Sequence, residues 1–318
     1  MKKRKVGSLD VSVVGLGGNQ FGRKVDREMT SRIIDAALEC GVTFLDTADR
    51  YGYGRQPFSG QARSEEFIGA ALRGRREEVI LATKFGNPMG DNPQDRGGSR
   101  RYVKVACERS LKRLQTDYID LYQIHSPDPD TPVEETLEAL TDLVTEGKVR
   151  EIGCSDYSVA QLQEAVGAAE RGGLRCYVSI QEEYSLLERS AAEKLLPFCE
   201  GTRIAFLPYF PLAGGLLTGK YRRNREIPQD ARLAEFPPNR PHLGLSTENL
   251  DQIERLSTFA EDRGHSLLEL AFAWLLAHPP VASVFAGATR PDQVEANARA
   301  ARWELTAQEL KDIANLTR

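Results

Sequence analysis

Four polar side chains stand at the ends of apolar runs or just beyond them. Asp46, Lys84 and His125 each directly follow a short apolar run, and Tyr51 comes five residues after Asp46. A polar group at the edge of an apolar core costs free energy unless a partner compensates it. We therefore take Asp46, Tyr51, Lys84 and His125 as the candidate catalytic residues.

These four side-chain types suit the reduction of a carbonyl group. The phenol of Tyr51 ordinarily has a pKa near ~10, which is too high for fast proton donation at neutral pH. The ammonium of Lys84 beside it would lower that pKa, and Asp46 would keep the lysine charged and in place. His125 would hydrogen-bond the carbonyl oxygen. Because no side chain supplies a hydride, a reduced nicotinamide cofactor must.

Each of these residues taken alone also has an ordinary structural interpretation. His125 could be a structural hydrogen-bonding group, and Lys84 could form an ion pair or a Schiff base. Asp46 could belong to a turn, and Tyr51 could pack in a loop. Four such coincidences at the ends of three consecutive apolar runs are improbable, so the combination favours catalysis.

The elements that must position these residues form a repeating β/α pattern. Stretches with helical spacing separate eight apolar, β-branched runs. These runs begin near Val11, Val42, Val79, Tyr118, Val149, Cys176, Arg203 and Val281. Such strands indicate a parallel sheet covered by helices, and eight units are the number that closes a (β/α)8 barrel, the TIM barrel. A doubly wound open sheet would require GxGxxG after its first strand, and Gly15–Gly18 does not match it.

We accordingly predict one α/β domain over residues 1–318, with catalytic residues at the C-terminal ends of the barrel strands. Two long loops, 85–99 and 221–246, are expected at that face. Helix N-termini are predicted at Thr131, with proline at the first helical position, and at the capping boxes that begin with Ser158 and Thr306. Gly147 is expected to end the helix that starts after Thr131.

Composition excludes several classes of protein. The 318 residues carry 42 basic and 46 acidic side chains, a net charge of −4, which disfavours a nucleic-acid-binding protein. The sequence shows no signal peptide, and no apolar stretch is long enough to cross a membrane. The five cysteines lack CxxC spacing, so neither a disulfide framework nor a zinc site is expected. A soluble cytoplasmic protein is predicted.

Four long segments, in the same order along the chain, resemble the signatures of the aldo-keto reductases: Gly41–Gly52, Ala82–Gly86, Asp117–His125 and Leu212–Tyr221. The resemblance covers nearly the whole sequence. It implies the (β/α)8 fold with an N-terminal β-hairpin closing the bottom of the barrel, for which Lys5–Val13 is the candidate. It also implies an NADP(H)-dependent reductase whose catalytic tetrad falls on the four residues above.

The resemblance further implies the cofactor-binding positions. These are Gly18 and Asn19 after the first strand, Ser155, Asp156 and Gln181 at the carboxamide, Tyr209 stacked on the nicotinamide, Phe210, Pro211, Leu212 and Gly214 at the pyrophosphate, and Gly287, Thr289, Arg290, Gln293 and Asn297 at the adenosine 2′-phosphate and adenine. Asp156 departs from the asparagine of the family, and an ionised aspartate can only accept hydrogen bonds. Ala286 and Ala296 replace the proline and glutamate that are common at their positions.

The favoured function is therefore NADPH-dependent reduction of a small-molecule aldehyde or ketone. Two alternatives remain at this point: a cofactor-binding regulatory subunit of the same fold, as in channel β-subunits, and a Schiff-base lyase using Lys84. The two long loops and the aromatic residues Phe21, Phe58 and Phe236 are the expected determinants of substrate choice, and the aromatics weakly favour an apolar or ring-bearing substrate. The sequence is compatible with a monomer.

Overall fold

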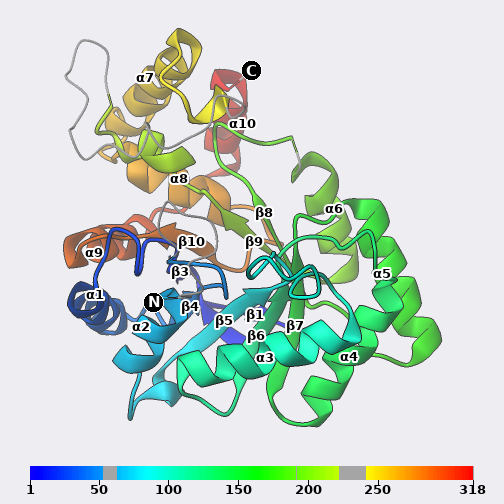
Figure 1. The fold of residues 1–318 in the computed structure, drawn as a ribbon. Coiled ribbons are helices and arrows are strands. Elements are labelled where there is room, and N and C mark those ends of the chain that lie inside the picture. Colours follow the sequence, from blue (N-terminus) through cyan, green and yellow to red (C-terminus); the bar gives the residue numbers. More distant parts are fainter. Residues whose placement is uncertain (53–62, 191, 222–240, 318) are drawn as a thin grey trace.

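The computed structural model describes residues 1–52, 63–190, 192–221 and 241–317, and it confirms the predicted barrel (Figure 1). Eight parallel strands pair in chain order, and β10 pairs with β3. A bridge between Phe206 and Val281 links the two remaining edges, so the barrel is nearly closed. The strands are β3 Val14–Gly17, β4 Phe44–Asp46, β5 Ile80–Phe85, β6 Ile119–Ile124, β7 Val149–Ser155, β8 Ser179–Glu183, β9 Ala205–Tyr209 and β10 Val284–Gly287.

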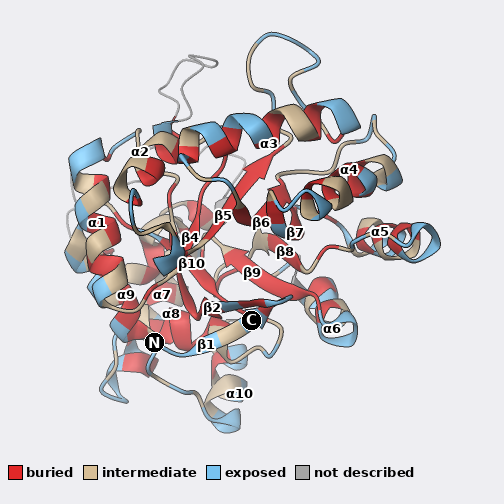
Figure 2. Cartoon of the chain, turned by 90° about the horizontal axis from the view of Figure 1, so that it is seen from below, coloured by how far each residue is buried: buried red, intermediate tan, exposed pale blue. Residues whose placement is uncertain are grey.

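Helices surround the barrel and turn their buried faces towards the strands (Figure 2). In α1, for example, the buried residues include Ile33, Ile34 and Ala37, which have the spacing of one helix face. The helices are α1 Arg27–Glu39, α2 Arg63–Ala71, α3 Arg100–Leu114, α4 Val133–Thr145, α5 Val159–Gly172, α6 Ala192–Thr202, α7 Thr247–Glu261, α8 Leu267–Leu276, α9 Pro291–Ala300 and α10 Ala307–Leu316. In the connections that the structure describes lie the short 3₁₀ helices η1 Arg76–Glu78, η2 Ala213–Thr218 and η4 Pro241–Leu243.

An N-terminal hairpin closes the bottom of the barrel. Strands β1 (Lys3–Val6) and β2 (Leu9–Ser12) pair in antiparallel fashion around a tight turn, where Gly7 has a φ of 56°. Its buried side chains, among them Val6, pack with Phe44 and Phe285 inside the barrel. The hairpin was predicted over Lys5–Val13, and the start of the first barrel strand near Val11 was wrong. Val11 belongs to the hairpin, because the chain reverses before Val14 begins β3.

The helix ends agree with the sequence signals in three of four cases. Both capping boxes form, at Ser158 and at Thr306, and Gly147 adopts a left-handed φ of 75° just after α4. The predicted cap at Thr131 is wrong. Pro132 is the residue before α4, and the Thr131 hydroxyl donates to Asp128 Oδ2 at 2.7 Å, so a nearby carboxylate takes the hydrogen bond expected at the helix end.

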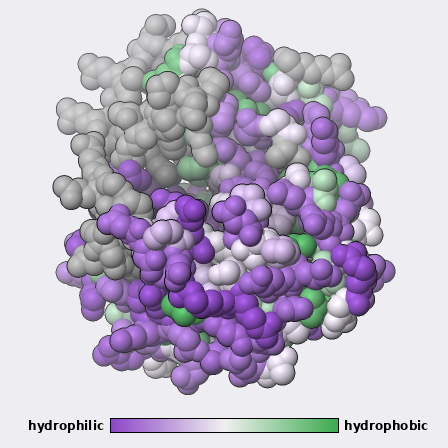
Figure 3. Space-filling model, turned by 45° about the vertical axis from the view of Figure 1, so that its right-hand side comes forward, coloured by the Kyte–Doolittle hydropathy of each residue, from purple (hydrophilic) through white to green (hydrophobic). Residues whose placement is uncertain are grey.

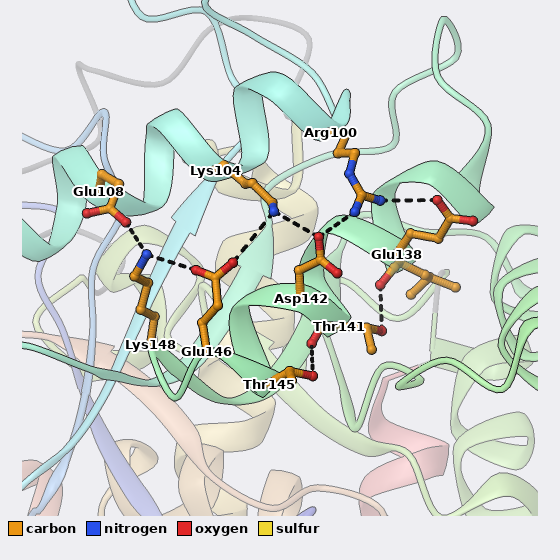
Figure 4. A network of polar contacts seen from close by, with 10 residues as sticks. Arg100, Lys104, Glu108, Glu138, Thr141, Asp142, Thr145, Glu146 and Lys148 are labelled. Atoms are coloured by element: carbon orange, nitrogen blue, oxygen red, sulfur yellow. Dashed lines mark hydrogen bonds and ion pairs between the residues drawn. The ribbon is translucent and has the colours of Figure 1, made fainter.

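The outer surface is largely hydrophilic on the face drawn in Figure 3. An ion-pair network joins α3 to α4, with Arg100 and Lys104 of α3 both pairing with Asp142 of α4 (Figure 4). Lys148 continues it through Glu146 at 2.8 Å. Exposed pairs stabilise little individually, so the network mainly fixes how the two helices face each other. No helix in the described part of the chain is long and apolar enough to cross a membrane.

Candidate active site

The side chains of Asp46, Lys84 and Tyr51 form a chain of contacts at the C-terminal end of the barrel. Lys84 Nζ donates to Asp46 Oδ2 at 2.6 Å, to the Thr47 carbonyl at 3.0 Å and to Tyr51 Oη at 3.4 Å. Asp46 ends β4 and Lys84 is the penultimate residue of β5, and Asp46 and Lys84 are both buried. The ammonium therefore lies between a carboxylate and a phenol, out of contact with solvent.

Two buried amides hold the second oxygen of Asp46. Gln181 Nε2 donates to Asp46 Oδ1 at 3.1 Å, and Gln123 Nε2 donates to the same atom at 3.4 Å. Gln181 was predicted only as a cofactor contact, and Gln123 was missed. A signal for Gln123 was present, because it stands at the alternate position between Leu121 and His125, on the face of β6 that points into the barrel. The two amides fix the carboxylate that orients Lys84.

His125 lies beside Tyr51, with the two rings 5.7 Å apart and edge to face. Burial, then the charges of Lys84 and Arg50, hold the pKa of His125 well below its usual value. The imidazole is therefore neutral at neutral pH and can still donate one N–H.

For Tyr51, burial raises the pKa of the phenol, while the Lys84 ammonium acts to lower it. The predicted acidifying effect of Lys84 is present, but in this structure burial outweighs it.

A tight loop carries Tyr51 to this position. The Asp49 amide donates to the Lys84 carbonyl at 3.0 Å, and the Tyr51 amide donates to the Ala48 carbonyl at 3.1 Å. Gly52 follows with a φ of 89°, and a Cβ there would lie 2.8 Å from the Phe21 carbonyl oxygen. Only glycine avoids this contact and adopts this φ without strain. This explains structurally why glycine follows Tyr51 in the motif.

The tetrad borders a cavity of about 870 Å³. Asp46, Tyr51 and His125 line it, while Lys84 lies behind them. The size and the mixed apolar and polar lining are typical of a small-molecule site. The predicted residues that line it are Asn19, Ser155, Asp156, Gln181, Tyr209, Phe210, Pro211, Leu212, Gly214, Gly287, Thr289, Gln293 and Asn297.

Some predicted site residues lie elsewhere. Gly18 does not line the cavity; its amide donates to the Asp46 carbonyl at 2.7 Å, so it joins β3 to β4. Arg290 is also outside the lining and pairs with the carboxylate of Asp292, two residues on, at 3.1 Å. Phe21 is buried in the core, which argues against its expected part in substrate choice. Phe58, Phe236 and most of the loop 221–246 lie outside the described residues.

The cavity also contains residues that sequence reasoning did not assign. Two of them are cationic, Lys24 in the loop after β3 and Lys220 after η2. Lys220 Cε lies 3.5 Å from the position of a Cβ on Gly215, so the lysine covers that glycine. Of these two lysines, the sequence could have pointed only to Lys220, because it stands inside the motif Leu212–Tyr221. Further lining residues include Gln20, Gly215, Thr218, Leu268 and Phe285.

The model of the Aldo/keto reductase family matches residues 13–318 of this sequence. The chain belongs to the aldo/keto reductase family. A solved structure of family member AKR11C1 from Bacillus halodurans, in its holo form, superposes with a TM-score of 0.80 at 36% identity. The match covers 100% of this chain and 97% of that chain.

Relatives in the family carry two kinds of name. Aldo-keto reductase YhdN of Bacillus subtilis is 36% identical over 96% of this chain and 89% of its own length. L-glyceraldehyde 3-phosphate reductase of Escherichia coli K12 is 35% identical over 90% of this chain and 82% of its own length. The "Probable voltage-gated potassium channel subunit beta" of Arabidopsis thaliana is 35% identical over 92% and 88% of the two lengths. This family therefore includes proteins named as oxidoreductases and proteins named as channel subunits.

Proposed function

We propose that this protein reduces an aldehyde or ketone to an alcohol, with NADPH as the source of the hydride. The observation that carries this proposal is the position of the Lys84 ammonium between Asp46 Oδ2 at 2.6 Å and Tyr51 Oη at 3.4 Å. Asp46, Tyr51 and His125 all line the cavity, so the phenol is accessible to a small molecule there.

The chemistry of the cavity lining fits a nicotinamide dinucleotide. Ser155 and Gln181 offer hydrogen-bonding groups and Tyr209 offers an aromatic face for the nicotinamide. Gly214 has a φ of 66° and allows close approach to the backbone, and Lys220 supplies a positive charge for phosphate groups. Thr289, Gln293 and Asn297 add polar groups for the adenosine part. When bound, the reduced nicotinamide supplies the hydride.

The residues of the chain move the proton and orient the substrate. The neutral imidazole of His125 donates a hydrogen bond to the carbonyl oxygen and fixes its direction towards Tyr51. As negative charge develops on that oxygen, Tyr51 Oη gives up its proton. Lys84 stabilises the resulting phenolate, and Asp46 keeps Lys84 charged in a buried position. Burial excludes bulk water, so the solvent screens the charge of Lys84 less than it would screen an exposed charge.

The preference for NADPH over NADH is proposed from the segment Gly287–Arg290. Thr289 lines the cavity, and Arg290 begins the turn into α9, where backbone amides and the helix dipole favour an anion. Arg290 is exposed and pairs with Asp292, and an exposed pair is weak enough for a phosphate to displace. A charge-assisted contact with the 2′-phosphate would then replace it.

The names of the relatives favour one second candidate, a cofactor-binding subunit without physiological turnover. A Schiff-base lyase is disfavoured, because Lys84 is fully buried and held by Asp46 and is not available to a substrate carbonyl. Turnover separates the two remaining functions. The assay follows NADPH absorbance with sugars, aromatic aldehydes, quinones and α-keto compounds.

We expect NADPH oxidation by the wild-type protein with at least one carbonyl class and a rate about 10²–10⁴-fold lower with Tyr51→Phe. Tyr122→Phe is the matched control, since the Tyr122 hydroxyl is buried away from the cavity and makes no hydrogen bond to any described residue. That variant should keep the wild-type rate. Absence of turnover with every carbonyl class, despite NADPH binding, would favour the regulatory subunit.

A further inference from the structure

Tyr209 and Asp156 are joined by a hydrogen bond at the edge of the cavity. Tyr209 ends β9, Asp156 directly follows β7, and both residues line the cavity. The Tyr209 hydroxyl donates to Asp156 Oδ1 at 3.0 Å. A phenol bonded to a carboxylate makes a charge-assisted hydrogen bond, which is stronger than one between neutral groups. The negative charge of Asp156 is thus attached to the far edge of the aromatic ring.

The backbone of Asp156 places the residue beside Tyr209, and the hydrogen bond from the Tyr209 hydroxyl holds its carboxylate at the ring. Its φ is 59°, in the left-handed region that aspartate and asparagine adopt more readily than most residues. Its amide donates to the Gln181 carbonyl at 3.1 Å, which ties the residue to β8. Asparagine fits the same backbone and offers the same oxygen to Tyr209. Replacing Asp156 with asparagine therefore removes the charge and keeps an acceptor for Tyr209.

Further acidic residues surround Tyr209. Burial raises the pKa of the Tyr209 phenol, and the charges of Asp156, Glu182 and Glu183 raise it more. Glu182 and Glu183 are the last two residues of β8. The phenol consequently stays protonated, and it remains a donor to Asp156 throughout the neutral pH range.

We propose that Asp156 and Tyr209 act as one unit that binds the oxidised nicotinamide ring more tightly than the reduced ring. This inference rests on the proposed function. The oxidised ring is cationic and the reduced ring is neutral, and a cation is attracted to an aromatic face. The carboxylate at the edge of Tyr209 adds a Coulomb attraction that acts on the cationic form alone. Asp156 is therefore a residue that determines specificity for the redox state of the cofactor.

The test measures dissociation constants for NADP⁺ and NADPH by protein fluorescence, which requires no turnover. In Asp156→Asn we expect NADP⁺ binding to weaken about three- to fivefold and NADPH binding to change less than about twofold, the scale of one partly screened charge. Asp10→Asn is the matched control. Asp10 pairs with Lys5 in the hairpin at the opposite end of the barrel, so the same change in net charge should leave both constants unaltered.

A second pair of variants tests whether the ring and the carboxylate act together. In a Tyr209→Phe background the hydrogen bond is lost, and Asp156→Asn should then change the ratio of the two constants less than about twofold. Two results would overturn the inference. One is a ratio of NADP⁺ to NADPH dissociation constants that is unchanged in Asp156→Asn. The other is a Tyr209→Phe variant that still distinguishes NADP⁺ from NADPH as well as the wild-type protein does. If the wild-type protein bound neither form, the proposed function would fail as well. If Asp156→Asn binds both NADP⁺ and NADPH and the ratio of their dissociation constants is that of the wild type, this inference is refuted and the proposed function is not.

Discussion

Replacing Lys84 with methionine separates the two consequences that follow from its position. Methionine is similar in length and fills the buried space, but it removes the ammonium between Asp46 and Tyr51. Among the described residues, the Asp46 carboxylate would then keep the hydrogen bonds from Gln181 at 3.1 Å and Gln123 at 3.4 Å. Leaving one charge of a buried pair unpaired costs about 3–5 kcal/mol, so Lys84→Met should lower the free energy of unfolding by about that amount.

The same substitution should lower turnover through Tyr51. Without the nearby ammonium, the phenol loses the charge that lowers its pKa against the effect of burial, and proton donation slows. The loss of kcat should resemble the removal of a general acid, about 10²–10⁴-fold. In a Tyr51→Phe background, where the acid is already absent, Lys84→Met should reduce kcat no further.

The double variant Asp46→Asn/Lys84→Met distinguishes the two effects. A neutral asparagine accepts and donates hydrogen bonds without an unpaired charge, so the free energy of unfolding should recover most of its loss, while kcat should not. Urea unfolding and steady-state kinetics measure the two quantities. Turnover of Lys84→Met within tenfold of wild type would refute the reasoning. So would joint recovery of stability and turnover in the double variant, which would make the loss purely structural.

Three further predictions concern the cofactor, its phosphate and a buried acid. Tyr51→Phe should leave NADPH affinity within about twofold, because the hydroxyl acts on the substrate oxygen; a fluorescence titration showing a tenfold loss would contradict this. Arg290→Ala should weaken NADPH about three- to tenfold and leave NADH unaltered, as measured by the same titration; equal losses would contradict the 2′-phosphate contact. Burial, then the charge of Glu65, raises the pKa of Asp49 well above its usual value, so stability should fall as pH rises above about 4. In urea unfolding, Asp49→Asn should remove that slope and be the more stable protein at pH ~8.

The strands were predictable because each is a short apolar run between turn-forming residues, and their observed starts lie within a few residues of the expected ones. The first strand was the exception. The segment Val11–Gly17 reads as one apolar run, and alternation alone does not reveal that the chain leaves the hairpin after Ser12 and enters the barrel at Val14. Tertiary packing decides this division, since Val11 packs inside the bottom of the barrel.

The candidate site was predictable where a rule of the fold connects sequence to position. Parallel strands end at the same face, so the residues that follow them meet there, and this brings Asp46 and His125 together. Contacts between inward-facing residues of neighbouring strands follow from register, which the sequence does not specify. Lys84 of β5 aligns with Gln123 of β6. This alignment brings the Gln123 amide, which the sequence analysis missed, close to the tetrad. Arg290 depends on a side-chain choice between Asp292 and a phosphate, which no spacing rule decides.

In the loop between β4 and α2, Tyr51 and Asp49 lie in different surroundings. A change at Asp49 should therefore alter stability without altering catalysis. Tyr51 points to the cavity and contacts Lys84, whose charge supports proton transfer. Asp49, two residues earlier, is buried on the other side, near Glu65 and Arg113, and neither of its oxygens has a hydrogen-bond partner among the described residues. Because its amide donates to the Lys84 carbonyl at 3.0 Å, Asp49 anchors the loop through its backbone, independently of the state of its carboxyl group. A neutral side chain at position 49 should therefore stabilise the protein without disturbing the geometry that Tyr51 needs.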